Sequence, residues 1–189
     1  HVLDKNHILG FGSDTVEKDG RVTTGGMKIS LFDVTDPANP IEKDNQVIGI
    51  QGTYSEMQYN HKALMISLSK GLMAFPITVS SKAAYTQDFV GAYVYNITNE
   101  SFTFKGTVTH QSDSTLLGEG DYKYYDYNYA INRLIYIGNS LYSLSQGKMV
   151  VTDLTNMSQT GEVTFPQKVY DYSTEPVLYD TMEVLPMVE

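Results

Sequence analysis

The stretch GMKISLFDVTDPANPIEK, residues 26–43, contains a complete strand and the turn that ends it. Apolar and polar side chains alternate from Met27 to Leu31, which is the period of a strand with one buried face. The segment DPANP at 36–40 follows. Proline fixes φ and has no amide donor, and Asp and Asn side chains bond to nearby backbone groups, so this segment ends the strand. We therefore predict a hairpin whose second strand begins directly after residue 40.

The same pattern occurs three times along the chain. The stretch GMKISLFDVTD at 26–36 is matched by GAYVYNITN at 91–99 and by GKMVVTDLTN at 147–156. Each copy has a Gly, alternating apolar positions, Asp or Asn, an aliphatic residue, Thr, and a final Asp or Asn. A second strand candidate follows each copy. The sequence therefore predicts one antiparallel hairpin repeated three times.

Further strand candidates precede these hairpins. Residues 61–80 and 131–145 each read as strand, tight turn, strand, and NHILGFGSD at 6–14 supplies an earlier strand at the start. Each unit is then a four-stranded antiparallel meander, and consecutive four-stranded sheets are the signature of a β-propeller. A β-sandwich also has short strands, but it does not require a long self-similar repeat. We predict an all-β partial propeller of about three blades, with approximate bounds 1–52, 53–110 and 125–166, and a C-terminal tail at 167–189.

Composition limits the classes of function. A chain of 189 residues, 41% of them apolar, is long enough for one domain, and its 15 Tyr and 15 Gly without Trp favour strands and turns. The net charge is −9 and the Lys and Arg residues are scattered, so we expect no nucleic-acid partner. No apolar run is long enough to span a membrane, and the absence of cysteine excludes disulfides. Because the chain starts at HVLDKN without Met or a signal sequence, we expect a mature or truncated piece of a longer protein.

These stretches resemble a bacterial and archaeal family of secreted proteins that carry a C-terminal β-propeller domain and are distantly related to WD repeats. The resemblance lies in HILGFGSDT, GMKISLFDVTDPANP, GTYSEMQYNHKALMI and NRLIYIGNSLYSLS. It implies a propeller fold and an extracellular or cell-surface location, without an established activity and without catalytic residues to carry over. The Tyr-rich stretch DYKYYDYNYA at 121–130 departs from the family pattern.

Three blades are too few to close a ring, because propellers have four to eight. An open arc leaves two terminal sheets with free edges, which invite pairing with another chain. We therefore expect either further blades outside this sequence or self-association of the chain through its terminal blades.

A calcium site is one candidate. The stretch SDTVEKDGR at 13–21 places Asp14, Glu17 and Asp19 on what reads as a short Gly-flanked loop, and carboxylate oxygens suit Ca²⁺. The spacing is not that of an EF-hand. The alternative is an acidic surface loop without a metal.

A second candidate is YSEMQYNH at 54–61, which brings Glu56, Tyr59 and His61 close in sequence. Glu56 and His61 could form an acid–base pair, or ligate a metal together with His7 or His110. The alternative is a structural one, in which a buried His61 ring hydrogen-bonds between blades. His7 and His110 lie at predicted strand ends, where we expect them to be solvated or capped rather than to act as ligands.

The Tyr-rich stretch is the third candidate. Tyrosines alternate from Tyr122 and Tyr124 onward, and on a loop they could form an aromatic platform for a sugar or a peptide. The alternative is a linker that packs Tyr124 or Tyr127 beneath a blade.

The sequence contains no phosphate-binding loop and no Gly-x-Ser-x-Gly nucleophile elbow. We therefore favour a non-enzymatic exported scaffold that binds a protein or a glycan at a loop face, without an obligatory cofactor. One alternative is a hydrolase or lyase in which Glu56 and His61 act in the propeller funnel. The other is a calcium-stabilised structural module.

Overall fold

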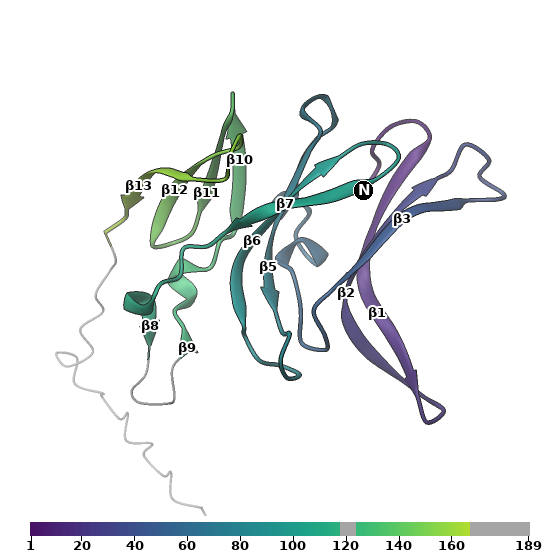
Figure 1. Ribbon diagram of the computed structural model, residues 1–189, viewed down its shortest axis with the longest axis horizontal. Helices are drawn as coiled ribbons and strands as arrows, with labels where there is room; N and C mark the ends of the chain where they lie inside the picture. The colour runs from purple at the N-terminus through teal and green to yellow at the C-terminus, as the bar shows by residue number, and fades with distance from the viewer. Residues whose placement is uncertain (118–123, 167–189) are drawn as a thin grey trace, which may run out of the picture.

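The computed structural model describes residues 1–117 and 124–166. In this part of the chain the regular structure is antiparallel β-sheet with short 3-10 turns (Figure 1). The first sheet comprises β1 (His7–Lys18), β2 (Arg21–Asp33) and β3 (Ile41–Ile48). The second comprises β4 (Met65–Ser67), β5 (Leu72–Val79), β6 (Phe89–Ile97) and β7 (Phe102–Val108). The third comprises β10 (Arg133–Ile137), β11 (Ser140–Leu144), β12 (Lys148–Asp153) and β13 (Gln159–Thr164).

Shorter elements lie in the connections between the sheets. A hairpin pairs β8 (Leu116–Leu117) with β9 (Tyr124–Tyr125). The 3-10 turns are η1 (Glu56–Gln58), η2 (His61–Ala63), η3 (Leu68–Lys70), η4 (Asp113–Thr115) and η5 (Tyr127–Tyr129). Each sheet follows chain order, so it is a meander, and the sheets do not close into a ring. The predicted all-β partial propeller is therefore confirmed.

The prediction of four strands in every sheet is wrong for the first sheet, which has three. The residues ahead of β1 contribute one isolated antiparallel bridge between Val2 and Ile8, with the Leu9 amide donating to the His1 carbonyl over 2.8 Å.

The DPANP segment forms the turn that the sequence predicts. Strand β2 ends at Asp33 and β3 begins at Ile41. The Asp36 carboxylate accepts hydrogen bonds from the Ala38 amide, at 3.0 Å, and from the Asn39 side chain, at 2.7 Å. These bonds satisfy the turn internally, so the two prolines end the ladder without leaving an unpaired donor.

All three sheets carry a β-bulge at the same place in the repeat. The register between the last two strands shifts after Leu31 in the first sheet, Val94 in the second and Val151 in the third. A bulge increases local twist, and sheets must twist to pack around a common axis. The repeat seen in the sequence is therefore also present in the structure.

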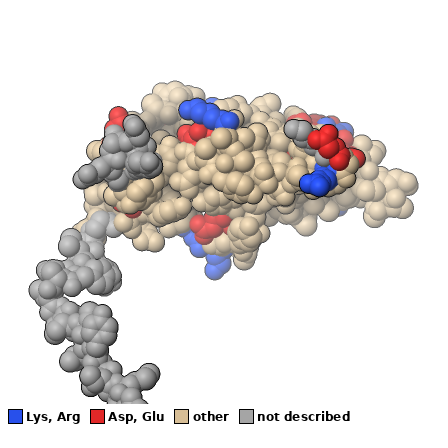
Figure 2. Space-filling model, turned by 90° about the horizontal axis from the view of Figure 1, so that it is seen from below, with Lys and Arg blue, Asp and Glu red and all other residues tan. Residues whose placement is uncertain are grey.

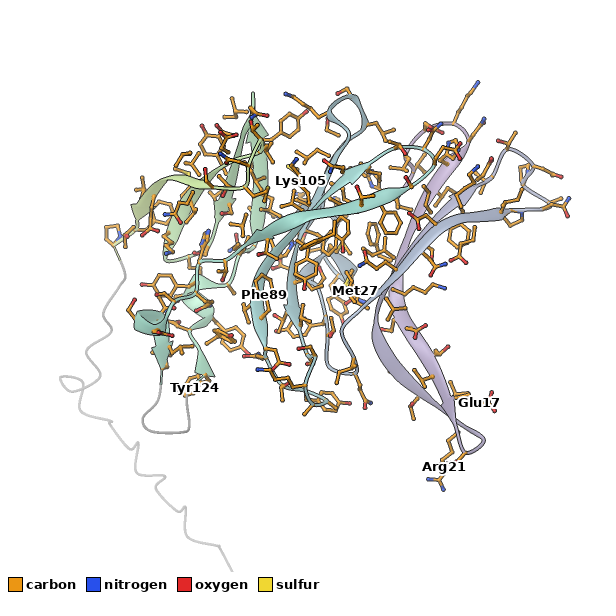
Figure 3. The ribbon with its side chains drawn as sticks, viewed as in Figure 1. Glu17, Arg21, Met27, Phe89, Lys105 and Tyr124 are labelled. Atoms are coloured by element: carbon orange, nitrogen blue, oxygen red, sulfur yellow. The ribbon has the colours of Figure 1, made fainter. Side chains whose placement is uncertain are left out.

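The core lies between the sheets rather than within any one of them. All eight residues of β5 are buried, because the second sheet is covered on both faces. Met27, labelled in Figure 3, belongs with Leu31 and Phe75 to the cluster between the first and second sheets. Ala74, Val94 and Leu141 belong to the cluster between the second and third. Face-to-face packing of consecutive sheets explains why β5 has a continuous apolar sequence instead of an alternating one.

No helix in the described residues is long and apolar enough to cross a membrane.

Candidate functional site: a tyrosine-lined end of the sheets

The connections between sheets meet at one end of the molecule. In an antiparallel meander, the loop between the second and third strands lies at the same end as the segment that leaves the fourth strand. The β5–β6 loop at 80–88 therefore lies beside the inter-sheet connections at 49–64, 109–117 and 124–132, at the lower end in Figure 1. The Tyr85 amide donates to the Gln51 carbonyl over 3.0 Å, which joins the loop to the first connection.

Three exposed tyrosines come from these three segments. Tyr54, Tyr85 and Tyr127 are 41%, 74% and 64% exposed. Tyr54 and Tyr127 line a cavity of about 160 Å³, and Tyr54 and Tyr85 line a neighbouring cavity of about 300 Å³. A third cavity, of about 370 Å³, is shared by Tyr85 and Tyr124. We call Tyr54, Tyr85 and Tyr127 with these cavities the tyrosine face.

The view from below shows that much of this end is uncharged (Figure 2). Charged side chains lie in a few separate groups around it rather than in one continuous patch. The tyrosine face is therefore an exposed aromatic surface without a strong field of one sign.

Backbone and side-chain bonds hold the tyrosines in place. Tyr54 and Thr78 exchange backbone hydrogen bonds of 3.0 and 2.9 Å, which fixes Tyr54 against β5. The Gln87 side chain donates to the Tyr127 hydroxyl over 3.0 Å. Each tyrosine is thus positioned by an element that lies outside its own segment.

The β5–β6 loop is ordered by Asp88. Its Oδ2 accepts the Ser81 amide at 2.6 Å, the Lys82 amide at 2.9 Å and the Thr86 hydroxyl at 2.9 Å. These bonds hold the pKa of the Asp88 carboxyl far below its usual range, and the two from backbone amides contribute most. The charged carboxylate therefore organises the loop that carries Tyr85.

Glu56, Tyr59 and His61 do not form a catalytic group. Glu56 lies on η1, lines the cavity between Tyr54 and Tyr127, and accepts a hydrogen bond of 2.9 Å from the Asn60 side chain. Tyr59 is 87% exposed. His61 is exposed on η2 and does not line that cavity, so the expected burial of its ring between blades is wrong. In the described chain no hydrogen bond joins Glu56 to His61.

Of the two predicted platform tyrosines, Tyr122 lies outside the described residues. Tyr124 is 57% exposed on β9 and borders the tyrosine face (Figure 3). Tyr127 is exposed as well, so neither Tyr124 nor Tyr127 is packed beneath a blade. Tyr54 and Tyr85 were not predicted, and their only signal in the sequence is that each follows the end of a predicted strand.

His7 and His110 are both buried, which corrects the expectation of solvated rings. The Nδ1 atom of His7 lies 2.8 Å from Asp4 Oδ1. The His110 ring enters the third sheet, where Nδ1 lies 2.9 Å from Ser145 Oγ and Nε2 lies 2.8 Å from Ser143 Oγ. Both rings are held by hydrogen bonds, and His110 joins the end of β7 to β11.

Asp14 and Glu17 lie within strand β1 and not on a loop, and Asp19 is in the turn that follows. The strand is longer than the sequence suggested because a register shift between Ser13 and Thr15 lets the pairing with β2 continue. Figure 3 shows Glu17 near the tip of this hairpin. Across the described residues, no three His, Cys, Asp or Glu side chains are grouped as metal ligands. The predicted calcium site thus has no geometric support.

A separate polar cavity of about 600 Å³ lies between the end of β7 and the third sheet. The Lys148 ammonium lies 3.1 Å from Glu162 Oε2 and 5.9 Å from the centre of the Tyr129 ring. The positive charge of Lys148 in this cavity is therefore already paired with groups of the same chain. No local sequence pattern indicates this cavity, because its walls come from distant segments.

Comparison with known proteins agrees with this architecture. A family model described as "Beta propeller domain" matches residues 1–157. An uncharacterised protein of the archaeon Archaeoglobus fulgidus is 32% identical over 76 residues, a match that covers 40% of this chain and 10% of the archaeal protein. No solved structure matches significantly. The chain belongs to the β-propeller domain family.

Proposed function

We propose that this chain is a non-enzymatic binding module that recognises a protein partner at the tyrosine face. Exposed Tyr54, Tyr85 and Tyr127 on adjoining cavities carry the proposal. Tyrosine is enriched in protein interfaces because it offers a large apolar surface with a polar tip at a small entropic cost. Because hydrogen bonds to neighbouring segments hold Tyr54, Tyr85 and Tyr127, little ordering is required on binding.

A protein is favoured over a glycan by the walls of the cavities. The cavity between Tyr54 and Tyr127 also includes Pro76 and Ile77, and Glu56 is its one charged residue. A sugar presents a hydroxyl at almost every carbon and needs several matching polar groups, whereas an amino-acid side chain needs few. The location implied by the family resemblance, extracellular or at the cell surface, is part of the proposal.

A catalytic alternative would require Glu56 and His61 to act together. They lie on separate 3-10 turns, and Glu56 bonds to Asn60 instead. We therefore propose binding rather than hydrolysis.

We further propose that copies of the chain associate through their terminal sheets. The outer face of the third sheet carries Ile135 and Ile137, which are 51% and 66% exposed. The equivalent surface of the second sheet packs against the third sheet, which supports the proposal that a further sheet packs on this face.

Selection from a phage-displayed peptide library against the immobilised chain tests the binding proposal. Peptides are expected to bind the wild type and to lose at least about tenfold in affinity with the triple variant Tyr54→Ser, Tyr85→Ser, Tyr127→Ser. The exposed Tyr59→Ser is the matched control, and circular dichroism checks folding. Peptides that bind the wild type and the triple variant equally would contradict the proposal. A glycan array run in parallel that alone gave binders would assign the face to sugars instead.

A further inference from the structure

We infer that the cavity between Tyr54 and Tyr127 receives a cationic side chain, Lys or Arg, of the protein partner. This inference rests on the proposed function, since it specifies what the tyrosine face recognises. We call this cavity the cation pocket. Among the residues that line it, the inference depends on Tyr54, Glu56, Thr78 and Tyr127.

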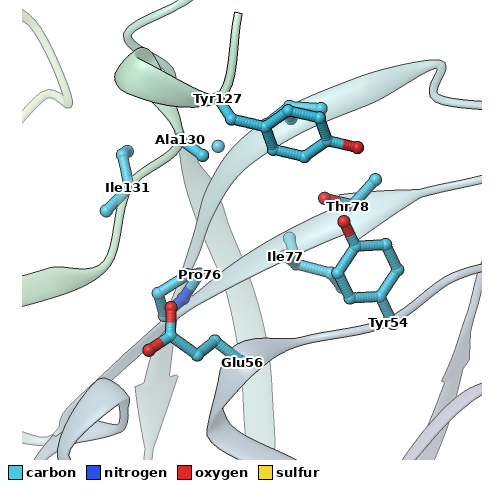
Figure 4. Close-up of a pocket in the computed structure, with 10 residues that line it drawn as sticks. Tyr54, Glu56, Pro76, Ile77, Thr78, Tyr127, Ala130 and Ile131 are labelled. Carbon is cyan, nitrogen blue, oxygen red and sulfur yellow. The ribbon is translucent and has the colours of Figure 1, made fainter. Parts of the chain in front are cut away.

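The pocket is built from three separated segments. Tyr54 precedes η1, Thr78 lies on β5 and Tyr127 begins η5. Figure 4 shows the Tyr54 and Tyr127 rings on two sides of the pocket with Thr78 between them, and Glu56 at the side near Pro76. Two aromatic rings and a carboxylate therefore border one small space.

The size of the pocket fits a single side chain. Its volume is about 160 Å³. Pockets for drug-sized ligands have volumes of roughly 300–1,000 Å³. The pocket is therefore suited to one side chain of a larger partner rather than to a free cofactor.

The charge of the lining groups determines which kind of side chain the pocket favours. Glu56 is the one charged residue among those lining the pocket, and its Oε1 accepts a hydrogen bond of 2.9 Å from the Asn60 side chain. No ion pair involves Glu56 in the described part of the chain. Tyrosine rings attract cations through the negative faces of their π systems. The carboxylate and the two rings thus favour the same sign of charge.

Other occupants are disfavoured by the same groups. A carboxylate or phosphate would be repelled by Glu56. An aliphatic side chain would remove water from the Glu56 carboxylate without supplying a partner, which is costly. A lysine or arginine side chain is attracted both by the two rings and by the Glu56 carboxylate.

Small amides test the pocket directly. N-acetyl-arginine methylamide, N-acetyl-lysine methylamide and neutral N-acetyl-norleucine methylamide are titrated into the ¹⁵N-labelled chain. The two cationic amides are expected to shift the backbone signals of Tyr54, Glu56, Thr78 and Tyr127, and norleucine is not. Equal shifts with all three amides, or none with the cationic ones, would overturn the inference.

A double-mutant cycle with a selected peptide separates this inference from the proposed function. Replacing its Lys by norleucine, or its Arg by citrulline, is expected to weaken binding to the wild type about tenfold and to have little effect on binding to Glu56→Gln. Glu17→Gln removes an exposed carboxylate from another hairpin and is the matched control. Tyr127→Phe keeps the ring and is expected to bind, whereas Tyr127→Ala is not.

The outcomes are distinguishable. If the peptides need the three tyrosines but carry no basic residue, or if the cycle shows no coupling with Glu56, the cation pocket is wrong and the binding face stands. If no peptide depends on the tyrosine face, both proposals fail.

Discussion

His110 has no exposed surface and bridges two sheets through two serine hydroxyls. Burial, with a smaller contribution from the nearby Lys148 charge, lowers the pKa of the ring to about 4. The imidazole is therefore neutral at pH 7, with one nitrogen donating to a serine and the other accepting from one. Protonation would replace the acceptor with a second donor inside the interface between the second and third sheets.

Folding stability is expected to fall as the pH drops from 6.5 to 4. The unfolded His110, with a pKa near 6.5, binds a proton in this range that the folded ring excludes, so acid favours the unfolded chain. The contribution is complete above pH 6.5, and about 2 to 3 kcal/mol of it is lost by pH 4. Urea unfolding at pH 7, 5.5 and 4.5 measures it, with His110→Gln as the comparison. Equal pH slopes for wild type and variant would contradict the assignment.

Tyr95 is a second residue whose polar atom has a clear energetic consequence. Its side chain is fully buried among Phe75, Phe102 and Phe104, and its hydroxyl makes no hydrogen bond within the described structure. Burial raises the pKa of this hydroxyl well above its usual range. The ring contributes packing, while the hydroxyl carries a desolvation cost.

Tyr95→Phe is accordingly expected to raise the free energy of unfolding by about 1 kcal/mol, because it removes the unpaired hydroxyl and keeps the ring. Equilibrium denaturation in urea checks this value. Tyr93→Phe, on the same strand and less buried, is the comparison. A loss of stability in Tyr95→Phe would show that the hydroxyl has a stabilising partner.

Individual elements differ in how far their sequence predicts them. The hairpins at 26–48, 91–108 and 147–164 could be predicted because alternation and turn residues are local signals. The extension of β1 through Asp14 and Glu17 could not, since a bulge changes which residues face the partner strand. Burial of His110 depends on a neighbouring sheet, which local pattern does not reveal.

The candidate site was only partly predictable for the same reason. Glu56 and Tyr124 stood out in sequence, and both border the tyrosine face. Tyr54 and Tyr127 come from different inter-sheet connections, and only the sheet topology brings them together. Sequence patterns identify candidate residues, whereas the topology of the sheets determines which of these residues lie close together.

The β5–β6 loop offers a test at the scale of one element. Asp88→Ala removes the acceptor of the Ser81 and Lys82 amides, so these amides are expected to exchange with solvent faster, while those of β5 remain protected. Amide exchange followed by NMR measures both. Asp113→Ala, in the exposed η4 turn, is the matched control. Unchanged exchange at Ser81 and Lys82 would show that the loop does not depend on Asp88.

At the scale of the whole molecule, three sheets pack in sequence and leave two outer faces. The register places Ile135, Tyr142 and Val151 in one row across the outer face of the third sheet. The inward face of the same sheet is buried through Leu134, Leu141 and Val150. Exposed apolar sheet faces of this kind favour association.

The chain is therefore expected to form dimers or larger assemblies as its concentration rises. Substituting Ile135→Lys and Ile137→Lys places charges on the outer face and is expected to give monomers. Val22→Lys, an exposed apolar residue near the β1–β2 turn, is the control that should still associate. Light scattering across a concentration series measures the mass. A wild type that is monomeric at every concentration would rule out self-association.

The binding end of the molecule can be located directly by hydrogen–deuterium exchange of the whole chain, with and without the tightest peptide from the selection. Binding at the tyrosine face predicts slower exchange at 49–56, 80–88 and 126–131, and unchanged exchange in the turns at 34–40 and 68–71, at the opposite end of the sheets. Protection confined to those opposite turns, or to the outer face of the third sheet, would contradict a binding site built from the inter-sheet connections.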